Sequence, residues 1–309
     1  MTRYAIISPV RNEREYLALT FESVTAQTTR PRRWVIVDDG SSDGTCELAR
    51  GWALRHSWIS VIARERQDHG GRGAPVVRAF LEGLAGLGAN TDVEFLVKLD
   101  GDVSFPPQHY EQLLSRFESS PQLGIAGGSL HEQDEAGNWI AKDMSPGSVA
   151  GPNRVYRMSC YQHIGGIAPA YGWDGIDEVE AQMRGWLTGT QSDLPYRHHR
   201  PEGARAGRAG RYLEQGYGAH YMGYDPLYLL LRAARSSARR HRLGPGALLI
   251  AGWIAGYLRG NPQHPHTAAR RFLRHRQRMR LLSMVGLAPA SQPRAAADVS
   301  HRSGGTGGF

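Results

Sequence analysis

Hydrophobic positions in the first hundred residues form short runs that alternate with longer segments of helical periodicity. The apolar runs occupy residues 4–7, 34–37, 59–63 and 95–99. The helical segments lie near residues 13–26, 44–55 and 74–87. Alternating strands and helices with short connections predict a parallel sheet that helices cover on both faces. The first half of the chain is therefore expected to be an α/β domain with a Rossmann-like, mixed but mainly parallel sheet.

Polar and acidic residues follow three of these apolar runs directly. They form the segments 8–13, 38–43 and 100–102, which read SPVRNE, DDGSSD and DGD. In open α/β sheets, ligands bind beyond the carboxyl ends of the strands. Three such clusters at one edge of the predicted sheet indicate a ligand site there.

The pattern changes along the rest of the chain. Residues 124–172 are rich in glycine and less regular, and we expect a smaller region with short strands there. A helix is predicted at about residues 175–187, where apolar residues recur on one face. We expect one domain over residues 1–225, with halves at about 1–122 and 123–225.

The last third has a different character. Residues 226–235 and 247–258 are apolar helical candidates, separated by a basic turn. The second run is shorter than the ~20 residues needed to cross a bilayer, which favours an amphipathic anchor in the membrane interface. We expect residues 226–287 to form this helical extension and residues 288–309 to be a disordered tail.

Charge and composition narrow the class of partner. The formal net charge of the 309 residues is +8, which suggests an anionic partner. Much of the excess comes from two arginine groups after residue 225, and few aromatic residues accompany the second group. We therefore expect peripheral contact with an anionic membrane surface and no nucleic acid.

Cysteine content and the first residues bear on location. The two cysteines, Cys46 and Cys160, provide neither a disulfide framework nor a zinc cluster, and they fit a reducing cytoplasm. No basic segment followed by a long apolar run opens the sequence, so no signal peptide is expected. We expect a cytoplasmic protein, peripheral on the inner face of the plasma membrane.

Asp100 and Asp102 follow an apolar strand pattern and precede two prolines that suit a helix start. Two carboxylates one residue apart at a strand end can share a divalent cation, and hard oxygen ligands suit Mg²⁺ or Mn²⁺. Such a cation would neutralise charge on a substrate phosphate. Asp38 and Asp39 end another strand pattern, free to accept hydrogen bonds from a base or ribose. The alternative for that segment is a turn followed by a helix cap.

These three segments, in this order and spacing, resemble glycosyltransferase family 2, and the match covers about residues 3–200. The resemblance implies a GT-A fold and inversion at the anomeric carbon. It implies that Asp39 reads the nucleobase and that Asp102 holds the metal on the diphosphate. Further candidates for contact with the nucleotide sugar are Pro9, Arg11, Glu13, Asp38, Lys98, Asp100 and Gly101. The two halves of the domain would then bind nucleotide and acceptor respectively.

Residues 70–74 read GGRGA and lie between the third strand pattern and the next helix. Family members often carry a basic residue at this place, near the diphosphate or base. Arg72 is therefore a candidate ligand, and the flanking glycines would allow close approach of the backbone. The alternative is an exposed loop arginine.

An inverting transferase needs a carboxylate that takes the proton of the acceptor hydroxyl. The family usually supplies it from a Glu-Asp pair at the start of a helix, but residues 173–175 here read WDG. One alignment makes Asp174 the base and the other makes Asp177 the base. Asp174 would also suit the helix cap, with Asp177 completing a capping box. Glu178 is expected to be solvated.

His198 and His199 follow this helix. A histidine at this place could complete the metal shell, and His199 is preferred. Alternatively, both are strand residues, one facing in and one out. The Gln-x-x-Arg-Trp motif of processive polysaccharide synthases is not found in the sequence. Its absence favours transfer of one sugar per encounter.

Together, these features predict an inverting, metal-dependent glycosyltransferase. Its expected partners are a nucleotide-diphosphate sugar, with uridine the expected base, and a glycan or lipid-linked acceptor. Bacterial-type cell-surface or exopolysaccharide synthesis is the expected setting. The alternative is a non-catalytic, membrane-associated subunit that binds nucleotide sugars, because the Glu-Asp pair is not intact.

Overall fold

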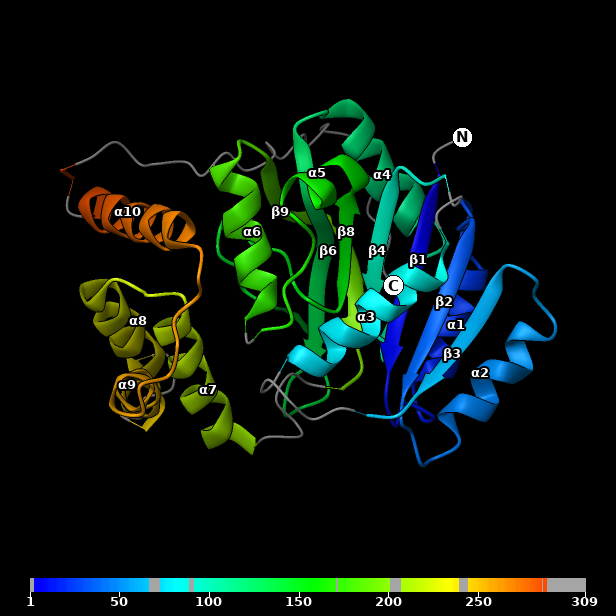
Figure 1. The fold of residues 1–309 in the computed structure, drawn as a ribbon, viewed down its shortest axis with the longest axis horizontal. Coiled ribbons are helices and arrows are strands. Elements are labelled where there is room, and N and C mark those ends of the chain that lie inside the picture. The colour runs from blue at the N-terminus through cyan, green and yellow to red at the C-terminus, as the bar shows by residue number, and fades with distance from the viewer. Residues whose placement is uncertain are drawn as a thin grey trace.

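The computed structural model describes residues 3–66, 73–88, 92–170, 172–200, 207–238, 244–284 and 286–287. Within these residues, nine strands form one mixed sheet in the order β3-β2-β1-β4-β8-β6-β9-β5, and β7 pairs with β6 (Figure 1). The strands are β1 (Tyr4–Val10), β2 (Arg33–Asp39), β3 (Ile59–Arg64), β4 (Phe95–Leu99), β5 (Val103–Ser104), β6 (Leu123–Gln133), β7 (Trp139–Ala141), β8 (Asn153–Arg157) and β9 (Leu187–His198).

The N-terminal half of the sheet is parallel. β1 lies between β2 and β4, and β3 pairs with the outer side of β2, all in parallel register. Val10 pairs with Asp38, and Ile7 pairs with Lys98. The carboxyl ends of β1, β2 and β4 therefore meet at one edge of the sheet, and the predicted mainly parallel α/β architecture is confirmed.

The second half adds antiparallel strands. β8 pairs antiparallel with both β4 and β6, whereas β9 runs parallel to β6. The glycine-rich segment was expected to hold short strands, but β6 has 11 residues. A Cβ on Gly127 would lie 2.6 Å from the Asn153 carbonyl oxygen, and one on Gly128 would lie 2.2 Å from that of Leu194. These glycines are therefore required by close neighbouring backbone, not by turns.

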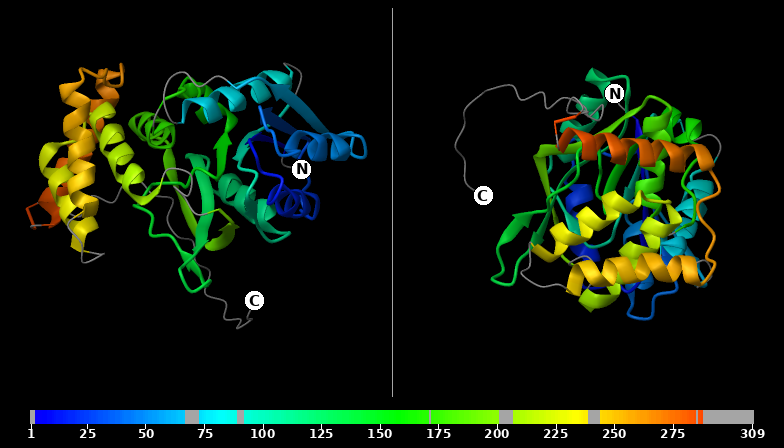
Figure 2. Two further views of the ribbon diagram at one scale, coloured as in Figure 1. Left: turned by 90° about the horizontal axis from the view of Figure 1, so that it is seen from below. Right: turned by 90° about the vertical axis from the view of Figure 1, so that its left-hand side faces the viewer.

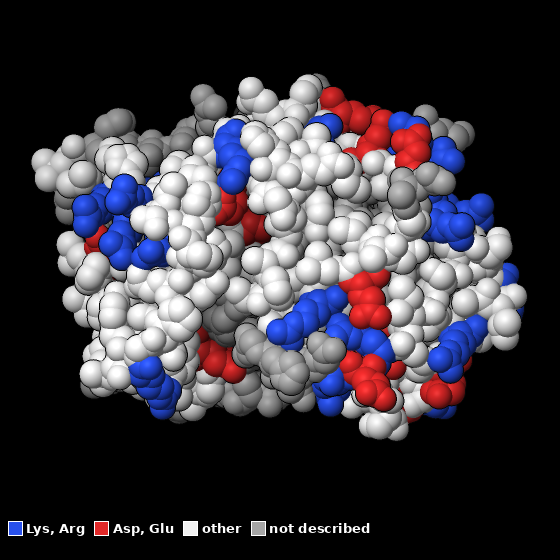
Figure 3. All heavy atoms as spheres, viewed as in Figure 1, with Lys and Arg blue, Asp and Glu red and all other residues white. Residues whose placement is uncertain are grey.

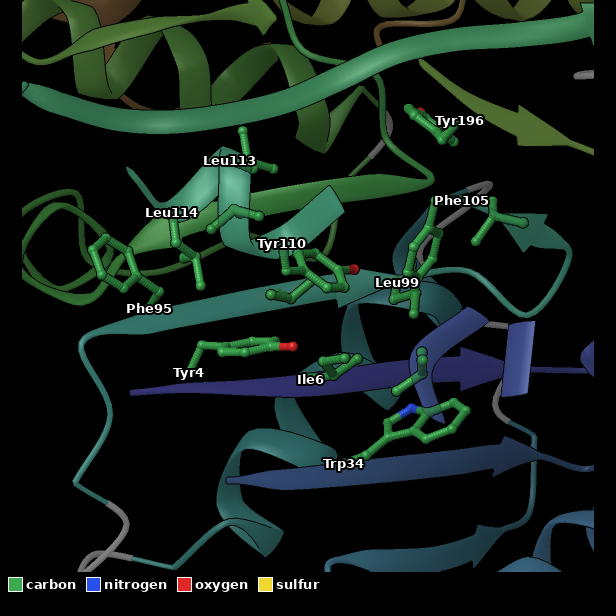
Figure 4. Close-up of a cluster of buried hydrophobic side chains, with 14 of the residues drawn as sticks. Tyr4, Ile6, Trp34, Phe95, Leu99, Phe105, Tyr110, Leu113, Leu114 and Tyr196 are labelled. Atoms are coloured by element: carbon green, nitrogen blue, oxygen red, sulfur yellow. The ribbon is translucent and has the colours of Figure 1, made fainter. Parts of the chain in front are cut away.

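Two hydrophobic cores lie on opposite faces of the sheet. Helices α1 (Leu17–Thr25), α2 (Thr45–Ala53) and α4 (His109–Ser119) cover one face. Helices α3 (Ala74–Gly86), α5 (Met158–His163) and α6 (Trp173–Met183) cover the other. Figure 4 shows part of the first core, where Tyr4, Trp34 and Tyr110 lie against the strands. Burial on both faces explains why the strands read as continuous apolar runs.

Four further helices gather at one end of the molecule, beyond α6 (Figure 2). They are α7 (Gly207–Tyr221), α8 (Pro226–Ala238), α9 (Gly244–Leu258) and α10 (Thr267–Met284), called here the helical layer. α7 packs along α9, so the layer begins before residue 226. Among the described helices, none combines the length and apolar character needed to cross a membrane.

A small apolar cluster joins the helical layer to the sheet domain. It contains Ile176 and Val179 of α6, Met222 after α7 and Ala269 of α10. His266, just before α10, also pairs with Glu180 of α6. The layer is thus attached to the sheet domain through α6.

Candidate active site

Residues 100–102 directly follow β4 and are fixed by the backbone of two other strands. The Asp100 amide donates to a carbonyl just before β8 at 2.8 Å, and the Asp102 carbonyl accepts from an amide just after β9 at 2.8 Å. Gly101 has little space around it, since a Cβ there would lie 3.0 Å from Val10. The acidic turn is therefore packed against the segment that follows β1.

The two carboxylates of this turn lie in different electrostatic surroundings. Lys98 forms an ion pair with Asp100 and donates to the Gly151 carbonyl at 3.1 Å. Burial raises the pKa of Asp100; the charge of Lys98 opposes this shift and that of Asp102 adds to it. Burial also acts to raise the pKa of Asp102, but hydrogen bonding to His198 and its charge outweigh it and leave that pKa lowered. Asp102 is therefore the carboxylate that keeps its charge more readily.

The structure places His198, not His199, beside the acidic turn. His198 Nε2 lies 3.4 Å from Asp102 Oδ1, and its Nδ1 lies 3.0 Å from Glu132 Oε1. His199 Nε2 instead bonds to Ser104 Oγ at 2.8 Å. Neighbouring residues at a strand end point to opposite sides, and the buried side is taken by His198. His198 is therefore the histidine closer to the Asp102 carboxylate, and the metal role considered for His199 stays a prediction.

Asp38 and Asp39 close β2 at the same sheet edge. Asp39 is 4% exposed, and its two carboxylate oxygens lie 3.1 Å from Arg66 Nη1 and 3.4 Å from Arg64 Nε. Asp38 Oδ2 accepts from the Ser41 amide at 3.1 Å, which is the turn contact considered above. Asp39 is thus held by two arginines at the end of β3.

The sequence pattern did not indicate the two arginines next to Asp39, and the basic candidate that it gave was Arg72. Arg72 lies outside the described residues. Asp39 pairs with Arg64 in the register of β2 and β3. Aligning the apolar run at residues 59–63 with the run at residues 34–37 from their first residues would have placed Arg64 beside Asp39.

The segment after β1 forms the next part of the edge. Pro9 lies within β1, and Arg11 follows its end and is partly buried. Glu13 is buried, and its Oε1 accepts from Arg200 Nη1 at 2.8 Å. Arg200 also donates to the Asn12 carbonyl at 3.2 Å. The chain after β9 therefore closes over this segment, a contact that the sequence pattern did not indicate.

Asp177 lies in the interior, behind the site. Both of its oxygens accept from Arg154 Nη1, at 2.6 and 2.7 Å, and Oδ2 also accepts from the Tyr156 hydroxyl. Glu178 was expected to be solvated, yet it is buried and accepts from Arg154 Nη2 at 2.6 Å and from the Val149 amide at 2.7 Å. Burial raises the pKa of Glu178 to about 8, and Arg154 opposes that shift. These groups form an ion network that holds α6 against β8.

Asp174 lies in the first turn of α6, on the side of the acidic turn. Its carboxylate sits beside Gly151, where an added Cβ would be 3.4 Å from Oδ2. Within the described residues, that carboxylate forms no hydrogen bond or ion pair. The alternative of a capping box is not found, since Gly172 occupies the N-cap in a left-handed conformation and α6 has no side-chain cap. Asp174 therefore has both carboxylate oxygens available.

One cleft of about 1230 Å³ runs from the acidic turn past α6 to the helical layer. Lys98, Asp100 and His198 line it at the sheet. Asp174 lines the same cleft from α6. The geometry thus brings the acidic turn and one of the two base candidates to a common space.

Residues 5–171, more than half of the chain, match the family model described as "Glycosyl transferase family 2". The chain belongs to this family. It is 23% identical over 227 residues to the succinoglycan biosynthesis protein ExoA of Rhizobium meliloti, with 63% of each chain covered. It is 29% identical over 133 residues to the glycosyltransferase AglE of Haloferax volcanii, covering 41% of this chain and 38% of that protein. The match thus spans less than two thirds of either relative.

Solved glycosyltransferases share the fold of this family 2 chain. A mannosyltransferase from Pyrobaculum calidifontis, in complex with GDP-Man and Mn²⁺, superposes with a TM-score of 0.55 at 16% identity, over 97% of this chain and 88% of that one. S. aureus TarS 1–349, in complex with UDP, superposes with a TM-score of 0.53 at 13% identity, over 91% and 72%. The GT-A fold implied by the resemblance is confirmed.

The donor atoms of this family 2 site fit a divalent cation that shares its coordination with a ligand. Asp102 offers a buried carboxylate of lowered pKa, and Asp100 lies two residues away. In the part of the chain that the structure describes, no group of three or more acidic, histidine or cysteine side chains is arranged to hold a metal alone. Oxygens from a bound diphosphate would have to complete the shell.

Proposed function

We propose that this protein transfers a sugar from a nucleotide-diphosphate sugar to a glycan or lipid-linked acceptor, with inversion at the anomeric carbon. Mg²⁺ or Mn²⁺ would assist, and a UDP-sugar is the expected donor. The observation that supports this most directly is that Asp100 and Asp174 line one cleft. A transferase needs such a space, because donor diphosphate and acceptor hydroxyl must meet within it.

The donor would lie along the carboxyl ends of β1, β2 and β4. Asp39, held by Arg64 and Arg66, would accept a hydrogen bond from the base. Asp100 and Asp102 would hold the cation, with His198 beside Asp102. When bound, the cation supplies positive charge to the leaving diphosphate. Pro9, Arg11, Glu13, Lys98 and Gly101 would shape the donor pocket, and Arg72 remains a candidate contact to the diphosphate.

Asp174 is the proposed base. Its carboxylate would take the proton of the acceptor hydroxyl while that oxygen forms a bond to the anomeric carbon. The bond from this carbon to the diphosphate oxygen breaks, and the nucleoside diphosphate leaves with the electron pair. Asp177 suits this role less well, since Arg154 and Tyr156 occupy its oxygens.

The non-catalytic alternative requires that the cleft lack a usable base. Both base candidates would then point away from the acidic turn. The position of Asp174 in the cleft, with no side-chain partner among the described residues, favours the enzyme.

Peripheral contact with an anionic membrane on the cytoplasmic side is proposed for the helical layer. Leu227, Leu230 and Leu231 of α8 are each about half exposed. Arg235 lies exposed on the same helix. Exposed leucines beside arginines are typical of surfaces that bind the membrane interface.

A thermal-shift screen of nucleoside diphosphates and nucleotide sugars, with and without Mn²⁺, tests this proposal. A ligand that binds only the folded state raises the melting temperature. We expect metal-dependent stabilisation by one nucleotide, lost in Asp102→Ala. The stabilising donor is then incubated with a detergent extract of lipid-linked glycans, and release of the nucleoside diphosphate is measured. Binding without release would favour the non-catalytic subunit, and no stabilisation at millimolar concentration would refute nucleotide-sugar binding.

A further inference from the structure

The arginines that line the cleft lie on one of its two walls. The wall formed by the sheet domain mixes four carboxylates with two lysines and a histidine: Asp100, Glu132, Asp174 and Glu178, beside Lys98, Lys142 and His198. The wall formed by the helical layer holds four arginines and one carboxylate: Arg211, Arg232, Arg276 and Arg280, beside Glu214. Figure 3 shows basic side chains gathered over the region of α8 and α10, at the left of the face viewed.

Arg276 and Arg280 stand one turn apart on α10, and both line the cleft. Within the described residues, neither guanidinium forms a hydrogen bond or an ion pair. Among the described contacts between cations and rings, the Arg276 guanidinium lies over the Phe272 ring, 5.9 Å from its centroid. Glu178 lies across from it but is already bound by Arg154. Partly buried guanidinium groups without a carboxylate partner favour the binding of an anion.

Arg232 of α8 faces the same space. Its Nη2 lies 3.4 Å from Gln215 Oε1, and its guanidinium is over the Tyr224 ring at 5.8 Å. Both contacts leave most of its five donors for a ligand. Three arginines from two helices thus converge on a cleft that also holds Asp174.

Apolar side chains also stand beside these arginines. Phe272, Leu273 and Met279 line the cleft beside them. On the outer faces of the same two helices, Leu230 is 52% exposed and Met284 is 67% exposed. A ligand with a phosphate and a hydrocarbon chain satisfies both features, whereas a neutral glycan would give the guanidinium groups hydrogen bonds but no counter-charge.

We propose that Arg276 and Arg280 of α10, with Arg232 of α8, bind the phosphate or diphosphate group of a lipid-linked acceptor. The glycan end of that acceptor would extend along the cleft and place its hydroxyl at Asp174. This assignment rests on the proposed function, and it makes the helical layer the element that selects the acceptor. Since the described arginines lie on the wall opposite the acidic turn, acceptor phosphate and donor diphosphate would occupy separate places.

Calorimetric titration of the full chain with farnesyl diphosphate tests the proposal. The donor site is first saturated with Mn²⁺ and the nucleoside diphosphate that stabilises the protein, so that the probe cannot bind there. Farnesyl diphosphate should bind more tightly than farnesol or inorganic diphosphate. Arg276→Gln/Arg280→Gln should weaken its binding on the order of a hundredfold, because a charge-assisted hydrogen bond contributes roughly tenfold or more in affinity.

Arg271→Gln is the matched control, since Arg271 is exposed on α10 and does not line the cleft. It should bind farnesyl diphosphate within about twofold of the unmodified chain. Arg276→Lys/Arg280→Lys keeps both charges and should retain most of the affinity, and Arg232→Gln should lower it by about tenfold. If the double glutamine variant does not fold, these two variants carry the test.

Several results would overturn the assignment. Equal affinity for inorganic and farnesyl diphosphate would show a site for a free anion. Weaker binding of the double variant to phosphatidylglycerol vesicles, with unchanged affinity for farnesyl diphosphate, would assign these arginines to the membrane surface. Failure of the proposed function is distinguishable, because it appears in the unmodified chain as absence of nucleotide binding or as binding without release of the nucleoside diphosphate.

Discussion

Replacing Asp177 by asparagine should destabilise the protein and leave the chemistry of the cleft in place. Asp177 is 2% exposed, and Arg154, which it pairs with, is fully buried. The asparagine keeps the volume but removes the charge, so that only Glu178 remains to neutralise Arg154. Removing one partner of a buried ion pair lowers the free energy of unfolding by about 3–5 kcal/mol.

The size of the thermal effect follows from the length of the chain. Unfolding entropy is about 2.1 cal per mole per kelvin for each residue, which gives roughly 0.65 kcal/mol/K for this chain. A loss of about 3–5 kcal/mol therefore lowers the melting temperature by about 5–8 °C. Scanning calorimetry or the tryptophan fluorescence of a thermal ramp would measure it.

Asp174→Asn is the matched variant, because Asp174 lies on the same helix but forms no ion pair among the described residues. Its melting temperature should stay within about 1 °C of that of the unmodified protein, because replacing a partly exposed carboxylate without an ion-pair partner usually changes stability by less than about 0.5 kcal/mol. Transfer should fall by about 10²–10⁴-fold, with unchanged nucleotide affinity. The reverse outcome, a stable but inactive Asp177→Asn and an active Asp174→Asn, would refute the division of roles.

Three further outcomes are expected. Asp102→Ala should abolish transfer without unfolding the protein, as judged by circular dichroism; full activity would contradict its metal role. Gly252→Ala should loosen the packing of α7 on α9 and speed amide hydrogen exchange in both helices. The added Cβ would lie 2.0 Å from the Leu213 carbonyl oxygen. Gly244→Ala is the control, because a Cβ there has open space and should not change the exchange rates. Burial lowers the pKa of His109 from 6.5 to about 3. The stability that neutral His109 contributes is therefore present above pH 6.5 and is lost as the pH falls toward 3, by at most about 4–5 kcal/mol. Urea titrations of His109→Gln should show a smaller loss of stability between pH 6 and 4.

The parallel half of the sheet was predictable because its signals are local. Each strand there is a short apolar run, and the residues that follow it directly belong to the candidate site. Strand pairing between β1, β2 and β4 then brings Asp38, Asp39 and Asp100 to one edge without any special contact. Local patterns and parallel topology suffice for such a site.

The remaining residues of the site depend on contacts between distant segments. His198 and His199 are adjacent, and only the pairing of β9 with β5 decides which of them faces Asp102. Asp177 looked equivalent to Asp174 until the position of Arg154 on β8 was known. The glycines of β6 suggested short, irregular strands, whereas they permit the close approach of other strands to one long strand. Sequence periodicity carries no information about such partners.

The attachment of the helical layer has a consequence for protein engineering. The proposed donor-side residues lie in the parallel half of the sheet, except His198 of β9, whereas the proposed acceptor-binding arginines lie in the helical layer. Acceptor preference should therefore be transferable between relatives by exchanging a C-terminal segment. The apolar cluster that joins Ile176 and Val179 to Ala269 decides where the junction must fall. A chimera joined just before α7 would separate the two sides of this cluster. One joined at the start of α6 would carry these residues together, and with them Asp174, the proposed base.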